Sequence, residues 1–160
     1  MSLFVKKGND GNLPTASYIS ENISPNSKKI CNDFLNDNFY EIPNGVLFEK
    51  NSLIYLVPQN MPFVNGDVLR YGLLLGEIRK NRFEPSHALF TAYGVKAKRI
   101  LNLQTGSKLL DDYLHGLEIP DAEIGQDGYI AVMADGVPLG YGKRSNGRIK
   151  NKYPKGLRLV

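Results

Sequence analysis

Extended runs of hydrophobic residues predict several short strands in the first half of the chain. Residues 46–48 and 53–57 are apolar runs joined by polar residues, which is the pattern of a hairpin. The three leucines at 73–75 stand between two glycines and predict a strand that is buried on both faces.

The last third of the chain is predicted to be mostly strands. Residues 129–134 and 137–142 flank an Asp-Gly pair that supplies the positive φ angles of a tight hairpin turn. Residues 148–153 alternate strictly between two kinds of side chain. One face of this strand would carry Ile149, Asn151 and Tyr153, and the other Arg148, Lys150 and Lys152. A rise of about 3.3 Å per residue would place successive cations about 6.6 Å apart.

Helical periodicity is confined to three short segments. The first begins after Ser27 and carries its apolar residues on one side. The second begins behind Pro85 and ends at Gly94, and the third covers residues 109–114 and ends at Gly116. Residues 1–26 are rich in Gly, Asn, Ser and Pro and lack any apolar period, which predicts a flexible arm or linker.

Short strands with a few short helices predict the α+β class, in the form of a small, partly closed barrel. We divide the chain into the arm at 1–26, a small helix-plus-hairpin element at 27–66 and one further domain at 67–160.

Composition excludes several classes of protein. The chain has 160 residues, enough to bury one core, and its single cysteine excludes both an internal disulfide framework and a cysteine-rich zinc site. No apolar run approaches the roughly 20 residues that a membrane-spanning helix needs, and the N-terminus lacks the apolar core of a secretory signal. We therefore expect a cytoplasmic protein with no membrane partner.

Charge is unevenly distributed along the chain. Residues 101–140 carry one Lys or Arg against seven Asp and Glu, whereas residues 141–160 carry seven Lys and Arg and no acidic residue. Such a basic end, interleaved with apolar residues, is typical of a folded surface that meets a polyanion.

Catalytic motifs are absent, so we assign no catalytic or metal-binding residue. The sequence has no phosphate-binding GxxxxGK[ST], no GxGxxG and no HExxH. His87 is expected to cap a helix, His115 to lie in a last helical turn, and Cys31 to pack in the core.

Basic residues interleaved with aromatic rings give the stronger signal. Cations that follow phosphates beside rings that stack on bases are what recognition of single-stranded or irregular RNA requires. The candidate RNA-binding residues are Arg79, Lys80, Arg82, Tyr141, Lys143, Arg144, Arg148, Lys150, Lys152, Tyr153, Lys155 and Arg158. A solvated charged face, an electrostatic protein-interaction module and, remotely, a small independent enzyme are the alternatives.

One long motif carries a resemblance to a known family. The stretch DGVPLGYGKRSNGRIKNKYPKGLR at 135–158, together with LRYGLLLGEIRKNRFEPSHALF at 69–90 and YLHGLEI at 113–119, resembles the C-terminal region of RsmF-type members of the Nol/Nop/Sun family of RNA cytosine-5 methyltransferases. The resemblance covers roughly residues 45–160. Lys152, His115 and the tyrosines at 129 and 141 depart from the family pattern, because the family usually has other residues there.

The resemblance implies a PUA-like RNA-binding module that positions structured RNA, expected to be ribosomal, for a catalytic domain on the same polypeptide. It also implies a structural motif made of Gly140, Gly142, Asn151, Pro154 and Gly156, in which the two glycines of the hairpin would let the main chain approach RNA closely. The parent enzymes need a doubly wound domain for S-adenosylmethionine and a nucleophilic cysteine after Pro or Thr. In this chain Cys31 follows Ile30. We therefore expect that the chain binds no cofactor and does not methylate RNA on its own.

Overall fold

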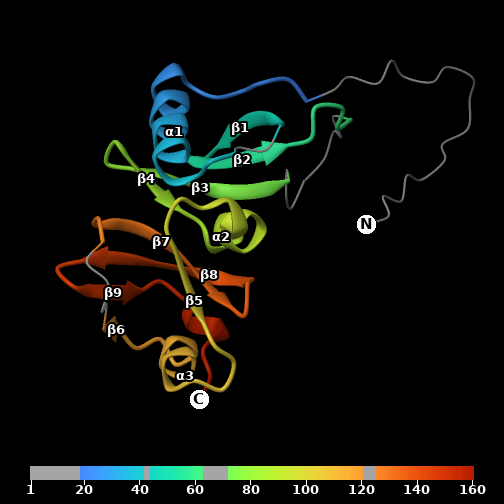
Figure 1. Cartoon of the computed structure of the whole chain (residues 1–160). Helices are drawn as coiled ribbons and strands as arrows, with labels where there is room; N and C mark the ends of the chain where they lie inside the picture. Colours follow the sequence, from blue (N-terminus) through green and yellow to red (C-terminus); the bar gives the residue numbers. More distant parts are fainter. Residues whose placement is uncertain (1–18, 42–43, 63–71, 121–124) are drawn as a thin grey trace, which may run out of the picture.

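The computed structural model of the chain describes residues 19–41, 44–62, 72–120 and 125–160. Two sheets lie one above the other with a helix between them (Figure 1). The first half contains α1 (Pro25–Asn38), β1 (Val46–Lys50), β2 (Leu53–Val57), β3 (Leu73–Arg79), β4 (Arg82–Pro85) and α2 (His87–Tyr93). The second half contains a 3-10 turn (Gly94–Lys96), β5 (Ile100–Leu103), α3 (Lys108–Leu114), β6 (Ile119–Pro120), β7 (Gly128–Ala134), β8 (Val137–Ser145), β9 (Arg148–Asn151) and a second 3-10 turn (Lys155–Leu157).

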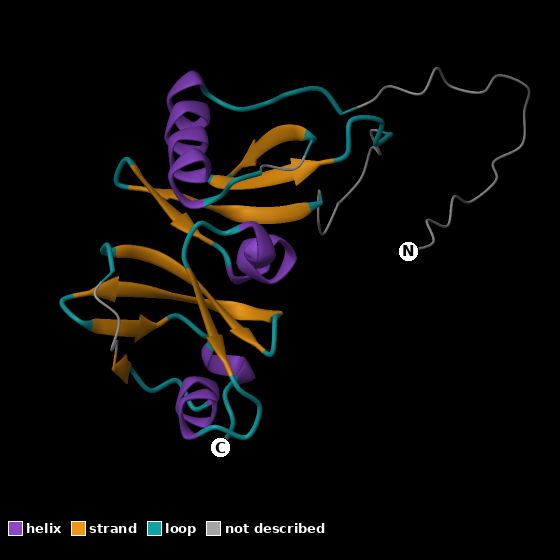
Figure 2. Ribbon diagram, in the orientation of Figure 1, coloured by secondary structure: helices purple, strands orange, loops and turns teal. Residues whose placement is uncertain are grey.

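The first sheet is antiparallel and has the order β1-β2-β3-β4. The second is curled and has the order β5-β7-β8-β9-β6, with β5 parallel to β7, and α3 lies on its side away from the first sheet. Figure 2 shows these strands and helices together, which confirms the α+β class and the partly closed barrel.

Pairing of β3 with β2 alters the predicted division of the chain. Residues 67–160 are predicted to form one domain, but β3 and β4 complete the sheet that the preceding hairpin begins. Strand pairing is a non-local choice, and an apolar run of three leucines does not encode which neighbour it takes. The predicted hairpins at 46–57 and 129–142 are confirmed.

The predicted flexible arm differs from the structure in its last residues. Residues 1–18 lie outside the described residues, but the side chain of Ile19 is buried and its backbone N–H donates to Met61 O at 3.0 Å. The first helix begins at Pro25, not after Ser27, because Ser24 is its N-cap and accepts from the backbone N–H of Ser27 at 3.1 Å. A Ser-Pro pair is a helix start that the apolar period alone does not reveal.

The two sheets share one core through α2. Phe90 of this helix stacks on Tyr141 of β8 with ring centroids 4.6 Å apart, and the Tyr141 hydroxyl donates to Pro85 O at 2.8 Å. A second core beneath the lower sheet contains Tyr113 of α3 and Ile149 of β9, both almost fully buried. The second sheet is therefore covered near its middle by α2 on one face and by the core around Tyr113 on the other. None of the described helices is long and apolar enough to cross a membrane.

Candidate nucleic-acid interface

Strand β9 presents its cations on one face, as its alternating sequence predicts. Ile149 is 1% exposed, whereas Arg148 and Lys150 on either side of it are exposed. Lys150 lies directly opposite Lys143 of β8, and Arg148 lies opposite Ser145. Because directly opposed residues of an antiparallel pair project from the same face, these three cations share one surface. We call Lys143, Arg148 and Lys150 the cation face.

Tyr129 of β7 extends this row by one strand. It lies opposite Lys143, whose Nζ stands 5.5 Å from the centre of the tyrosine ring. The same ring makes an edge contact with Phe34 of α1, with centroids 5.2 Å apart. Burial and the nearby carboxylate of Glu84 raise the pKa of the Tyr129 hydroxyl. The ring thus supports the Lys143 ammonium from below. Sequence reasoning missed this role, which depends on the register of β7 and β8.

Carboxylates neutralise the cation face only in part. Arg148 forms an ion pair with Glu118 at 3.9 Å, and both side chains are more than half exposed. An ion pair that is this exposed to solvent contributes little free energy, so it holds Arg148 only weakly. Lys143 and Lys150 make no ion pair with any residue of the described ranges. Their charges are therefore available to a polyanion.

The predicted cations of the first sheet line a cavity of about 640 Å³ at the β3–β4 turn. Its lining includes Arg79, Lys80, Arg82 and Glu84. Arg79 pairs with Glu77 at 3.2 Å, and both groups are exposed. Figure 1 shows the β3–β4 turn on the same side of the molecule as the β8–β9 turn.

Two of the predicted RNA-binding residues are buried. Tyr141 is 9% exposed, and burial, the largest cause, raises the pKa of its hydroxyl to about 12. Its ring packs against Phe90, so it is not available to stack on a base. Arg144 is 6% exposed, and its guanidinium lies against Gly125. Both expectations are therefore corrected: Tyr141 and Arg144 stabilise the sheet in this structure.

The C-terminal motif residues hold the end of the chain on α3. Arg158 donates from Nε and Nη2 to Tyr153 O at 3.3 and 3.2 Å, and its guanidinium lies against Gly116. The Tyr153 ring packs between those of Tyr113 and His87, with centroids 5.2 and 5.6 Å away. These contacts place Arg158 and Tyr153 within the fold. Four further residues of the motif range from half-buried to exposed: Lys152, Pro154, Lys155 and Gly156.

Asn151 ties the end of β9 to the end of α3. Its side-chain amide donates to Tyr113 O at 2.8 Å and to Leu117 O at 2.9 Å. Its side-chain oxygen accepts from the backbone N–H of Tyr153 at 2.7 Å. This one side chain fixes three backbone groups where the cation face ends.

Gly140 and Gly142 are needed for internal packing. A Cβ at Gly140 would stand 2.7 Å from Tyr113 Oη and 2.8 Å from His87 Cε1. A Cβ at Gly142 would collide with Ile149 Cγ2 and stand 3.1 Å from Lys150 O. The space above each glycine is filled by the protein itself, which corrects the expectation that they admit an RNA backbone.

Of the groups considered for catalysis, Cys31 lies in the core and His87 is half-buried. Cys31 is fully buried, and burial raises the pKa of its thiol to about 12, which leaves it protonated. Burial also lowers the pKa of His87, which follows the N-cap of α2. Among the described residues, no group of three His, Cys, Asp or Glu side chains could hold a metal ion.

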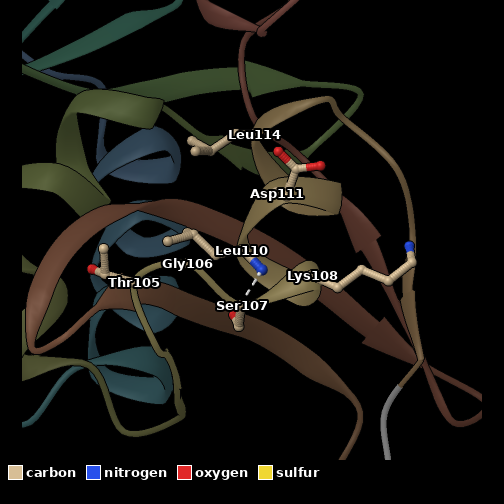
Figure 3. Close-up of a pocket in the computed structure, with 7 residues that line it drawn as sticks. All are labelled: Thr105, Gly106, Ser107, Lys108, Leu110, Asp111 and Leu114. Carbon is tan, nitrogen blue, oxygen red and sulfur yellow. Dashed lines mark hydrogen bonds between the residues drawn. The ribbon is translucent and has the colours of Figure 1, made fainter.

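A second pocket, of about 570 Å³, lies at the start of α3 (Figure 3). Ser107 caps this helix by accepting from the backbone N–H of Leu110 at 3.3 Å. Lys108 pairs with Asp112 at 2.8 Å, so the charge beside the pocket is mixed. None of the predicted RNA-binding residues is in its lining.

Comparison with known proteins decides the family. Residues 31–92 match the model of the RsmF rRNA methyltransferase first C-terminal domain, and residues 101–159 match that of the methyltransferase RsmF PUA domain. This chain belongs to the RsmF family. The first match ends at residue 92 in α2 and the second begins at residue 101 in β5, and between them the chain passes from one sheet to the other.

Curated relatives agree with this assignment. The chain is 30% identical over 155 residues to the ribosomal RNA small subunit methyltransferase F of Aeromonas salmonicida, covering 95% of the chain and 31% of the relative. It is 30% identical over 121 residues to the protein of that name from Aeromonas hydrophila, covering 74% of the chain and 25% of the relative. The match to the Shewanella protein (strain MR-4) is 27% over 141 residues, covering 82% and 29%. This RsmF-family chain thus spans less than a third of the length of these relatives.

Proposed function

We propose that this chain is an RNA-binding C-terminal module of an rRNA methyltransferase. It docks structured RNA and positions a cytosine for C5 methylation by an S-adenosylmethionine-dependent domain on the same polypeptide, in the cytoplasm. The names of the relatives, which are small subunit rRNA methyltransferases, and the match to the RsmF PUA domain support the choice of RNA.

The observation that carries the proposal is the cation face on β8 and β9. Two paired strands hold Lys143, Arg148 and Lys150 on one surface. Ile149 is buried on the opposite face of β9, which fixes the orientation of that surface. Polyanion binding needs cations in fixed register more than it needs a deep pocket, because phosphate contacts set position and orientation.

Catalysis belongs elsewhere in the parent enzyme. The only cysteine, Cys31, is buried with a raised thiol pKa, so it cannot attack a base. The two sheets of the described chain are mainly antiparallel and do not form the doubly wound parallel sheet that holds a dinucleotide-like cofactor. The residues present therefore do not fit S-adenosylmethionine, and no step of methylation is assigned to them.

Fluorescence anisotropy with a labelled RNA stem-loop tests the proposal. With the three residues of the cation face and the neighbouring Lys152 each neutralising a phosphate, log affinity should fall with log salt at a slope of about −2.8, using about −0.7 per contact. The double variant Lys143→Gln with Lys150→Gln should lower the size of the slope by about 1.4 and weaken binding at every salt concentration.

The matched control removes two charges outside the cation face. Lys29 on α1 and Lys108 on α3 are exposed, so Lys29→Gln with Lys108→Gln should bind RNA as the parent chain does. Binding that ignores salt, or that both double variants weaken equally, would contradict the proposal. Salt-sensitive self-association without RNA binding would favour the protein-interaction alternative.

A further inference from the structure

The β3–β4 turn carries charge in a backbone conformation that suits other residues better. Lys80 and Asn81 both have positive φ, 47° and 57°, as in a type I′ turn. The other described two-residue hairpin turns, 51–52, 135–136 and 146–147, also have positive φ at both positions, but they begin with Asn, Asp and Asn. Asn and Asp tolerate the left-handed region, whereas Lys adopts it at a cost. A strained lysine at this tip needs a reason outside the turn.

Neighbouring side chains point to a phosphate ligand as that reason. Arg79 and Arg82 flank the turn as a directly opposed pair, and together with Lys80 they line the cavity described above. Glu77 offsets Arg79 by an ion pair at 3.2 Å. Lys80 and Arg82 make no ion pair within the described residues, so the turn is a concentrated positive charge at a concave surface.

A continuous series of contacts joins this turn to the cation face. Phe83 follows Arg82 on β4 and packs on Phe34 at 4.7 Å, and Phe34 packs on Tyr129 at 5.2 Å. The ring of Tyr129 in turn lies beneath the ammonium of Lys143. Glu84 on β4 is close enough to Tyr129 to raise its pKa. These contacts connect β4, next to the basic turn, with the cation face of the second sheet, and the two hairpin turns lie on the same side of the molecule (Figure 1).

We propose that the β3–β4 turn is a second phosphate-binding element, which grips the RNA backbone from the first sheet while the cation face holds it from the second. This inference rests on the proposed function and deepens it. The first C-terminal domain then contributes Lys80 and Arg82 to RNA binding directly, and the PUA domain does not bind alone. Glu84 lies within this element and repels phosphate.

Lys80→Asn gives the sharpest test, because it separates charge from fold. Asn suits the left-handed turn better than Lys, so the melting temperature of the full chain should stay the same or rise. Affinity for the labelled RNA stem-loop should nevertheless fall, and the size of the salt slope should drop by about 0.7. The matched control is Lys108→Gln, which removes one exposed charge from α3 and should leave affinity and slope unchanged.

A gain of binding gives a second, independent readout. Glu84→Gln removes the carboxylate that borders the cations and should tighten binding by about two- to fivefold, the size of an exposed charge pair. Arg82→Gln should weaken binding more than Arg79→Gln, because Arg79 is already offset by Glu77. If the turn had only a structural role, Glu84→Gln would not tighten RNA binding, and Arg82→Gln would not weaken it more than Arg79→Gln does.

The outcomes separate this inference from the proposed function. If Lys80→Asn binds as the parent chain does while Lys143→Gln with Lys150→Gln loses binding, the inference is overturned and the proposed function stands. Equal loss in Lys80→Asn and Lys108→Gln would indicate diffuse charge and also overturn it. Failure of the parent chain to bind the stem-loop, or equal competition by polyglutamate, would overturn both.

Discussion

Two hairpins, one from each sheet, present cations, and they are built in different ways. In β8–β9 the cations stand along paired strands, each backed by a buried neighbour, and the turn is the favourable Asn146-Gly147 pair. In β3–β4 the cations gather at the turn itself, and Lys80 occupies a position that suits Asn or Gly. The first arrangement places charge by regular packing, and the second does so at the expense of local backbone energy. Charge is thus positioned by strand packing in one hairpin and by a strained turn in the other.

Gly76 of β3 lies opposite Pro85 of β4, and Gly142 of β8 lies opposite Asn151 of β9. Replacing these two glycines should give the largest losses of stability. A Cβ at Gly76 would collide with the backbone oxygen of Glu84, whereas one at Gly142 would first meet the movable Ile149 side chain. Both alanine variants should lose about 1–3 kcal/mol of unfolding free energy in urea titrations, and Gly76→Ala should lose more.

Gly156→Ala is the control, because no atom lies within 4 Å of its Cβ position. Equal stability of the parent chain and Gly76→Ala would show that the two strands of the first hairpin are more loosely paired than the structure has them.

The end of β9 is fastened to α3 by Asn151, whereas the β3–β4 hairpin is fastened to α2 by Ser86, which donates to Leu74 O and accepts from the backbone N–H of Leu89. Asn151→Ala removes the amide donor to Leu117 O and to Tyr113 O, which keeps its bond from the backbone N–H of Gly116, so it should cost about 1–3 kcal/mol. Asn151→Asp keeps the acceptor for Tyr153 N–H and should lose the two donated bonds. Thermal unfolding of both variants measures this, and an unchanged melting temperature in Asn151→Ala would contradict it.

His87, at the start of α2, lies beside Tyr153 and the backbone of Gly140 in the second half of the chain. Burial lowers its pKa below the 6.5 of the unfolded chain. The unfolded state therefore binds the proton first as pH falls, so stability is full above pH 6.5 and declines below it. Melting temperatures measured from neutral to acidic pH should show this decline.

His87→Gln should flatten that profile relative to the parent chain. His115→Gln changes an exposed histidine at the end of α3 and should leave the decline in place. A decline of the same size in both variants would assign it to other groups.

The smallest effect concerns how Lys143 is held. Tyr129→Phe keeps the ring and should leave RNA affinity unchanged. Tyr129→Leu removes the aromatic face beneath the ammonium and should weaken binding by the equivalent of about 0.5–1 kcal/mol. Anisotropy titrations of the folded variants check this. If both variants bind equally, the ring does not position Lys143.

Local periodicity predicts one face of β9 but not what covers the rest of the sheet. The alternation of 148–151 is a property of the strand itself, so it could be recognised from the sequence. Tyr141 and Lys143 project from the same face of β8, yet one is buried and the other exposed, because α2 covers only the first. That coverage depends on packing between distant segments. For the same reason the partner of β3 could not be predicted.

Lysine acetylation footprinting by mass spectrometry, with and without an RNA stem-loop, tests the central claim most directly. The account predicts that RNA protects Lys80, Lys143 and Lys150, while Lys29 and Lys108 react at the same rate in both samples. Protection of Lys108 in place of Lys143 and Lys150, or no protection at any lysine under conditions where RNA is bound, would contradict it.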